Sequence, residues 1–310
     1  MVGANMLASL KLWRDRRGRL SALRIITLGL LMTPIALAIA ASNEIRFSAR
    51  PINDLIHRAG YWALLFVLLA LAITPLRRIA RFGQLADVRR MIGVGAFCYA
   101  AAHISLFVTY QMFDLSKVAT EIALRLYLTI GFVALLGLTA LASTSTDGMV
   151  RRLGPRRWQR LQQVIYGIAL LALIHFFQQT KADIWVPTFV ASLFGWLMAY
   201  RFLIWSRRTN DEPSPWMLLG LTLVVSALTF VFEAIGIGIA FSVSPLMVLQ
   251  TAFDFDLEAL DIRPGWLVLG AGVGIVALDI VRAWWRRPAS RKPRPEIRRE
   301  RAKPIPASNF

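Results

Sequence analysis

Long apolar stretches recur along the whole chain and are separated by short polar segments. Each of eight such stretches is about as long as a helix that crosses the hydrocarbon core of a membrane. We expect these spans at residues 24–42, 60–76, 91–111, 124–143, 163–181, 187–206, 215–242 and 264–285. The polar segments between them are too short to bury a core of their own. The pattern therefore predicts an all-α integral membrane protein with about eight transmembrane helices.

Composition agrees with this class, since 56% of the residues are hydrophobic and only 17% are charged. The single cysteine, Cys98, lies in the third span and can form neither an internal disulfide nor a thiolate metal cluster. The glycines of "GAGVGIVAL" at 270–278 lack the strand that precedes a nucleotide-binding loop. We interpret them as sites of close helix packing.

Basic residues cluster on alternate connections between the spans. Examples are "KLWRDRRGR" before the first span and "RRLGPRRWQR" before the fifth, and the net charge of the chain is +18. Because Lys and Arg favour cytoplasmic loops, this alternation predicts that both termini lie in the cytoplasm. It also supports an even number of helices.

A polar break at 207–215 separates the last two spans from the first six. Glu233, in the seventh span, is a candidate functional residue because burying a charge in a membrane is costly. We expect four segments: a basic cytoplasmic N-terminus (1–23), a six-helix transmembrane core (24–206), a linker with two extra helices (207–285), and a basic, proline-rich cytoplasmic tail that is disordered (286–310).

Three histidines occur in the sequence: His57, His103 and His175. At 1.5 Å per residue, His103 lies roughly 18 Å along the third span and His175 roughly 21 Å along the fifth, so the two have similar depths. Two imidazoles at matched depth can ligate one haem iron from opposite faces. The alternative is a hydrogen bond between helices. His57 begins the second span, either as a further ligand or as an ordinary side chain of the membrane surface.

Gln162 lies thirteen residues before His175, in "RLQQVIYGIALLALIHFF". Thirteen residues of helix span roughly 19.5 Å, so the two side chains lie at opposite membrane depths and on different faces. A glutamine amide can hydrogen-bond a cofactor or a neighbouring helix, but it does not replace imidazole as a strong iron ligand.

Four segments resemble the MsrQ/YedZ family, the haem-binding membrane subunit of the periplasmic methionine sulfoxide reductase system, within the ferric reductase-like transmembrane group. They are "HRAGYWALLFVLLALAITPLRR" (57–78), "RRMIGVGAFCYAAAHISLF" (89–107), "RLYLTIGF" (125–132) and "TSTDGMVRRLGPRRWQRLQQVIYGIALLALIHFF" (144–177). The resemblance implies a six-helix core of the bacterial inner membrane that carries b-type haem. It also implies transfer of electrons to a periplasmic molybdopterin methionine sulfoxide reductase, which repairs oxidised proteins.

The resemblance assigns roles to single residues. His103 and His175 match the family's histidines on the third and fifth helices, and His57 matches the one that begins the second. The family has a histidine at the position of Gln162. We therefore expect one haem, held by His103 and His175, with two haems as the alternative. The two extra helices lie outside the resemblance.

The electron donor is expected to be a cytoplasmic flavin reductase or quinol. FMN or a quinone would then bind near the cytoplasmic ends of the helices, where arginines could attract a flavin phosphate. The preference of Lys and Arg for cytoplasmic loops explains the same arginines without a cofactor. These residues are Arg77, Arg78, Arg151, Arg152, Arg156 and Arg157.

Two other functions fit the sequence less well. A ferric or general transmembrane reductase would use the same haem with another acceptor. A transporter or assembly subunit would use the histidines for proton movement, but such proteins often have repeated halves, and none is evident here. In the leading interpretation, the partner binds the outer loops around 43–57, 111–124 and 181–187.

Overall fold

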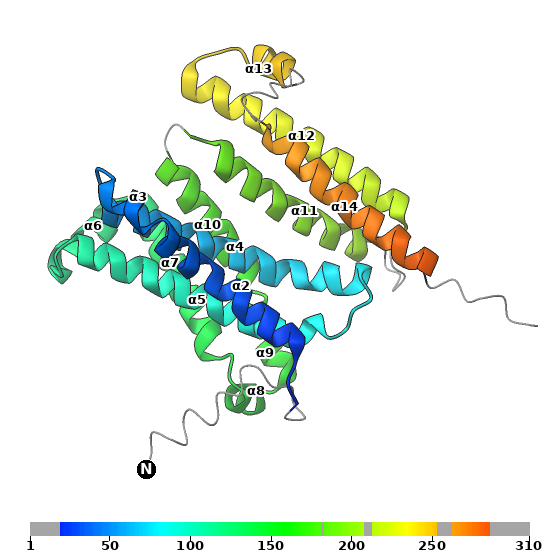
Figure 1. Ribbon diagram of the computed structural model, residues 1–310, viewed down its shortest axis with the longest axis horizontal. Coiled ribbons are helices and arrows are strands. Elements are labelled where there is room, and N and C mark those ends of the chain that lie inside the picture. Colours follow the sequence, from blue (N-terminus) through cyan, green and yellow to red (C-terminus); the bar gives the residue numbers. More distant parts are fainter. Residues whose placement is uncertain (1–18, 181–182, 208–212, 253–261, 286–310) are drawn as a thin grey trace, which may run out of the picture.

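The chain folds into a bundle of long helices (Figure 1). The computed structural model describes residues 19–180, 183–207, 213–252 and 262–285, so the predicted disordered tail at 286–310 lies outside the described residues. Within these ranges no β-strand occurs. The helices are α2 (Ala22–Ala40), α3 (Ser42–Phe47), α4 (Pro51–Ile79), α5 (Leu85–Tyr110), α6 (Leu115–Leu124), α7 (Leu126–Ser143), α8 (Asp147–Leu153), α9 (Pro155–Gln162), α10 (Ile165–Thr180), α11 (Trp185–Arg207), α12 (Pro215–Phe241), α13 (Pro245–Thr251) and α14 (Pro264–Trp285).

The predicted fold class is confirmed. Eight spans in the described ranges are long and apolar enough to cross a membrane, and α9 with α10 forms one of them. Large apolar side chains such as Ile35, Leu136 and Leu228 are exposed on the outside of the bundle. Such exposure suits a surface that faces lipid, where contact with hydrocarbon carries no hydrophobic penalty.

Helix boundaries depart most from the prediction in α4. We expected a span at 60–76, but the helix runs from Pro51 to Ile79 and has 29 residues. Its first turns contain polar residues, including Asp54 and His57, which a hydropathy pattern excludes from a span. Proline at the first position favours this helix start, because it has no N–H to leave unpaired there.

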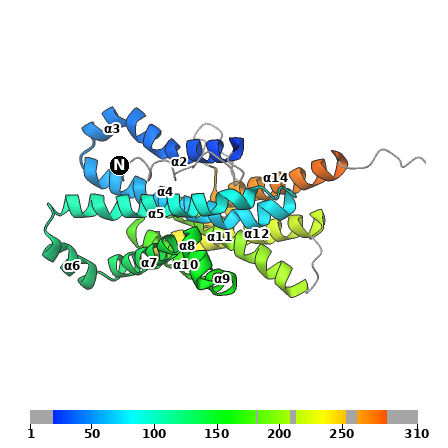
Figure 2. The same ribbon diagram turned by 90° about the horizontal axis from the view of Figure 1, so that it is seen from below.

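α4 is the central helix of the bundle. It packs against α5, α10 and α11, and its residues Phe66 and Leu71 are almost fully buried. Figure 2 shows α2 and α3 on one side of α5, with α7 and α10 on the other. The helices α4 with α5, and α7 with α10, form the two pairs between which the candidate site lies.

Pro75 interrupts the backbone hydrogen bonds of α4. Because proline has no N–H, the carbonyl of Leu71, four residues earlier, has no donor from within the helix. Arg201 of α11 supplies one: its Nη2 donates to Leu71 O at 2.6 Å, and its Nε donates to the Tyr166 hydroxyl of α10 at 3.2 Å. One guanidinium thus connects α4, α10 and α11.

The two extra helices pack on this core through α11. Trp196 of α11 donates its indole N–H to the Thr222 hydroxyl of α12 at 3.1 Å. Thr222 in turn contacts Gly272 of α14 so closely that any larger residue at 272 would clash with it. Close helix packing is therefore confirmed for Gly272, and space is open around Gly270 and Gly274.

Glu233 has a structural partner. Its side chain is buried, and Arg263, directly before α14, lies with Nη1 3.3 Å from its carboxylate. This ion pair joins α12 to the start of α14. It accounts for an acidic residue in an apolar helix, because a buried charge needs an opposite charge nearby.

We predict that the effect of removing Arg201 depends on Pro75. Arg201→Met leaves Leu71 O without a donor, whereas Pro75→Ala restores a backbone N–H to that carbonyl. In a double-mutant cycle, Arg201→Met should be about 1–3 kcal/mol more destabilising in the wild-type background than in the Pro75→Ala background. Reversible unfolding in detergent micelles measures this difference. Equal effects in both backgrounds would contradict the assignment.

Candidate functional site

A cavity of about 760 Å³ opens at one end of the bundle, within the size range of ligand pockets. It lies between α4, α5, α7 and α10, at the end where α4 and α7 begin and α5 and α10 finish. Its deeper wall is apolar and includes Val67, Leu138 and Ile168. The short helix α6, which the sequence did not predict, contributes to the mouth.

His103 of α5 and His175 of α10 line this cavity and face each other. The centres of their rings lie 6.3 Å apart, and the ring planes are inclined at 81°. The sequence-based depth estimate placed these two side chains at one level, and the structure brings them together there. They come from helices of different pairs, so the packing of those pairs sets their separation.

Each imidazole is held by a backbone carbonyl of the partner helix in its pair. Nδ1 of His103 lies 2.8 Å from Ile56 O of α4, and Nδ1 of His175 lies 2.7 Å from Tyr127 O of α7. A carbonyl oxygen only accepts, so each Nδ1 donates its proton. Nε2 of each ring therefore carries a free lone pair, which is the tautomer that ligates a metal.

This geometry suits one metal ion between the two rings. Two metal–nitrogen bonds of about 2 Å on opposite sides of one ion separate the imidazole centres by roughly 6 Å. In the described part of the chain, no group of three or more His, Cys, Asp and Glu could hold a bare ion. Two imidazoles and an apolar cavity could instead hold an iron that a porphyrin supplies.

The mouth of the cavity carries positive charge. Arg50, Lys117 and Arg125 line it, from the start of α4, from α6 and from the residue before α7. Arg125 pairs with the Glu121 carboxylate. Hydrogen bonding to Tyr127 and attraction to Glu121 raise the pKa of the Arg125 guanidinium, so it stays charged. These cations could bind the carboxylates of an amphipathic cofactor whose apolar part fills the cavity.

His57 also lines the cavity, with an exposed side chain in the second turn of α4. Its place near the mouth fits a contact with a cofactor edge better than axial ligation, because the other two imidazoles already oppose each other.

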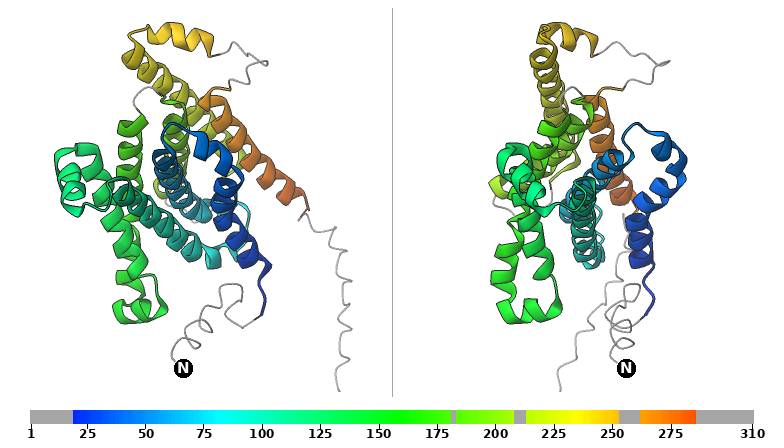
Figure 3. Two further views of the ribbon diagram at one scale, coloured as in Figure 1. Left: turned by 60° about the vertical axis from the view of Figure 1, so that its left-hand side comes forward. Right: turned by 90° about the vertical axis from the view of Figure 1, so that its left-hand side faces the viewer.

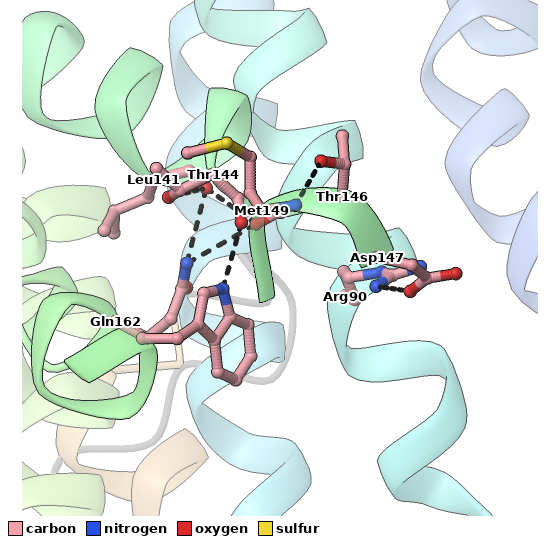
Figure 4. A network of polar contacts seen from close by, with 9 residues as sticks. Arg90, Leu141, Thr144, Thr146, Asp147, Met149 and Gln162 are labelled. Carbon is pink, nitrogen blue, oxygen red and sulfur yellow. Dashed lines mark hydrogen bonds and ion pairs between the residues drawn. The ribbon is translucent and has the colours of Figure 1, made fainter. Parts of the chain in front are cut away.

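Gln162 lies away from the cavity and has a structural contact (Figure 4). Its Nε2 donates to Leu141 O at 3.3 Å, and the Trp158 indole donates to Thr144 O at 3.0 Å. Both acceptors belong to the end of α7, where helix carbonyls lack donors from within the helix. The ion pair between Arg90 and Asp147 ties α5 to α8 beside them. Gln162 thus helps to cap α7.

The six predicted cofactor-binding arginines do not line the cavity. All six side chains are exposed, and they lie at the end of α4 and on α8 and α9. Figure 3 shows the α8–α9 segment at the lower end of the bundle, far from the helix ends that form the cavity mouth. They are Arg77, Arg78, Arg151, Arg152, Arg156 and Arg157.

Sequence reasoning missed the cations at the mouth and two glycines behind the histidines. Gly60 of α4 lies against His103, and Gly131 of α7 lies against His175. Each glycine is four residues after the carbonyl that its histidine binds. That spacing is present in the sequence, but it has meaning only once the helix pairs and their register are known.

Comparison with known proteins identifies the family. The family model "Ferric reductase like transmembrane component" matches residues 56–173, which include His57, His103 and Gln162 and end two residues before His175. A protein from Xanthomonas euvesicatoria pv. vesicatoria (strain 85-10), named protein-methionine-sulfoxide reductase heme-binding subunit MsrQ, is 41% identical over 171 residues. The match covers 77% of that protein and 54% of this chain. The chain belongs to the MsrQ family.

A second MsrQ, from Herminiimonas arsenicoxydans, is 36% identical over 171 residues, which are 78% of that protein and 54% of this chain. No solved structure matches the chain. Since 171 residues are 77% of the Xanthomonas MsrQ, that relative has about 220 residues, whereas this chain has 310. Helices α12 to α14 lie beyond the residues that the family model matches.

We predict that Gln162→Ala lowers the free energy of unfolding by about 0.5 kcal/mol, the low end for one hydrogen bond. Leu141 O loses the amide donor but still accepts from the hydroxyls of Thr144 and Ser145. Gln163→Ala, at the adjacent position, is the control and should change stability less. Unfolding in detergent micelles measures both. If Gln162→Ala has no larger effect than Gln163→Ala, the proposed cap of α7 contributes nothing.

Proposed function

We propose that this MsrQ-family chain is a haem-carrying electron-transfer subunit in the membrane part of a methionine sulfoxide reductase system. The observation that carries the proposal is the pair of imidazoles that face each other across the cavity at 6.3 Å with Nε2 free. The names of the two relatives support the proposal, because both describe a heme-binding subunit of a methionine sulfoxide reductase.

His103 and His175 would hold the iron of one b-type haem, which supplies a one-electron carrier when bound. The carbonyls of Ile56 and Tyr127 orient the two imidazoles and would make them more basic ligands. The apolar wall of the cavity would exclude water from a bound iron, and this exclusion would influence the reduction potential. The haem propionates would bind the cations at the mouth. Two of these cations, Arg50 and Lys117, have no carboxylate partner among the ion pairs of the described residues.

We infer one haem per chain. The sequence has three histidines, and all three are at the cavity end of the bundle. Gln162, at the family's histidine position, donates its amide to the end of α7 and is a poor iron ligand. A second haem in the other half of the bundle would therefore lack imidazole ligands.

Electrons would then reach the haem from the opposite end by another carrier. The exposed arginines of α4, α8 and α9 are suited to a flavin phosphate, which supports FMN or a cytoplasmic flavin reductase as donor. Quinol is the second donor that we consider. The same arginines support an orientation in which this end faces the cytoplasm of a bacterium and the cavity faces the periplasm across the inner membrane.

The partner would be a periplasmic molybdopterin methionine sulfoxide reductase. It would dock at the cavity end, where apolar residues are exposed: Phe47 at the end of α3, and Met112 and Phe113 in the turn before α6. Reduction of methionine sulfoxide would occur in that partner, and this chain would supply the electrons. The six-helix core at 24–206 would carry the function, with the helices at 207–285 as an addition to it.

We predict that His103→Ala and His175→Ala each abolish the spectrum of a haem with two axial imidazoles. His57→Ala and Gln162→Ala are the controls and should retain it, because neither side chain is a proposed ligand of the iron. The measurement is the optical spectrum of detergent-purified protein, oxidised and reduced. Retention of that spectrum in either of the first two variants would exclude the residue as a ligand.

The haem content of the wild-type chain tests the number of sites. A pyridine haemochrome assay should give one b-type haem per polypeptide. A value of two would contradict the one-haem assignment, and no haem would overturn the proposed function. A reduced haem that transfers electrons to ferric chelates but not to a methionine sulfoxide reductase would favour a general reductase.

A further inference from the structure

Both candidate haem ligands rest against a glycine of a neighbouring helix. A Cβ atom at Gly60 would lie 2.9 Å from Nδ1 and 3.1 Å from Cε1 of His103. A Cβ atom at Gly131 would lie 2.8 Å from Nδ1 and 2.9 Å from Cε1 of His175. These separations are shorter than ordinary van der Waals contacts between carbon and nitrogen. Any other residue at either position would push the imidazole away.

The two glycines have the same relation to the carbonyl that each histidine binds. His103 donates to Ile56 O, and Gly60 is four residues after Ile56. His175 donates to Tyr127 O, and Gly131 is four residues after Tyr127. In an α-helix the N–H of residue i+4 occupies one lone pair of the carbonyl of residue i. The second lone pair accepts from the imidazole, and it stays accessible because residue i+4 has no side chain.

The arrangement occurs once in each helix pair. In the α4–α5 pair, α5 carries the histidine and α4 provides the carbonyl and the glycine. In the α7–α10 pair, α10 carries the histidine and α7 provides the other two groups. The surrounding sequences, "IHRAGYW" and "YLTIGFV", share little else. What the two pairs share is therefore an arrangement in space: a carbonyl and a glycine four residues later contact one imidazole ring.

We propose that Gly60 and Gly131 are positioning residues that set the two imidazoles in the orientation for axial ligation of one iron. The proposal rests on the proposed function, since it assumes that His103 and His175 ligate a haem. An alanine at either position would add a methyl group, which would displace the ring from the carbonyl and turn Nε2 away from the centre of the cavity.

A plain packing role for these glycines is the rival explanation, and the chain offers matched controls for it. Gly95, in the same helix as His103, would bring its Cβ to 2.5 Å from the Leu31 side chain, which does not line the cavity. Gly93 in α5 and Gly167 in α10 share helices with the two histidines, and no neighbouring atom lies within 4 Å of an added Cβ at either. Gly95→Ala therefore adds crowding away from the cavity, and the other two add only a methyl group.

The experiment compares Gly60→Ala and Gly131→Ala with Gly93→Ala, Gly95→Ala and Gly167→Ala in the full chain. Each protein is purified in detergent with its haem, and the spin state is read from the optical and electron paramagnetic resonance spectra. We expect Gly60→Ala and Gly131→Ala to lose the low-spin signal of two imidazole ligands and to gain a high-spin signal. Haem affinity should fall about ten- to a hundredfold, as for other residues that orient a metal ligand. The three controls should keep the wild-type spectrum.

Wild-type spectra in Gly60→Ala and Gly131→Ala would overturn the proposal. It would also be overturned if Gly95→Ala lost the low-spin signal to the same extent, because crowding alone would then suffice. A wild-type chain without haem is a different result, which would overturn the proposed function and this proposal with it.

A second measurement keeps the proposal testable if Gly60→Ala does not fold. In the double variant Gly60→Ala/His103→Ala the methyl group has the space of the missing ring. We expect this double variant to unfold at the same or a higher denaturant concentration than His103→Ala alone, because alanine favours a helix more than glycine does. If it also fails to fold, the clash is with another group, and the proposal for Gly60 is wrong.

Discussion

Hydrogen bonds from side chains to helix carbonyls organise this bundle. A polar group in an apolar interior must find a partner or lose the free energy of its hydration. For His103 and His175 the partners are Ile56 O and Tyr127 O, on helices next to their own. Each bond orients a ring and determines which nitrogen is left to bind a metal. The cavity, its ligands and the proposed cofactor all depend on these two bonds.

The same principle explains features that first suggested function. Arg201 lies in an apolar helix because the proline in α4 leaves Leu71 O without a donor. The amide of Gln162 donates to Leu141 O at the end of α7, which also accepts from the Ser145 hydroxyl. Glu233 has an ion-pair partner in Arg263. These three polar side chains are therefore held by contacts within the protein.

A division of the bundle into two ends follows from these contacts. At one end an apolar cavity has facing imidazoles and cations at its mouth, as a haem with its propionates requires. At the other end several arginines are exposed, and the amide of Gln162 donates to the end of α7. This asymmetry is the physical basis for proposing one haem near the acceptor and a different carrier near the donor.

The sequence by itself determined the spans, the membrane class and the matched depths of His103 and His175. It could do so because a transmembrane helix satisfies its own backbone hydrogen bonds, so its length and hydropathy are local properties. The short helices α3 and α6 escaped prediction, because with 6 and 10 residues they lack the length that marks a span. Tertiary structure alone decided that Gly60 and Gly131 lie behind the histidines and that Arg50 and Lys117 reach the mouth. Those contacts depend on how one helix is rotated and shifted against the next, and packing between distant parts of the chain sets that register.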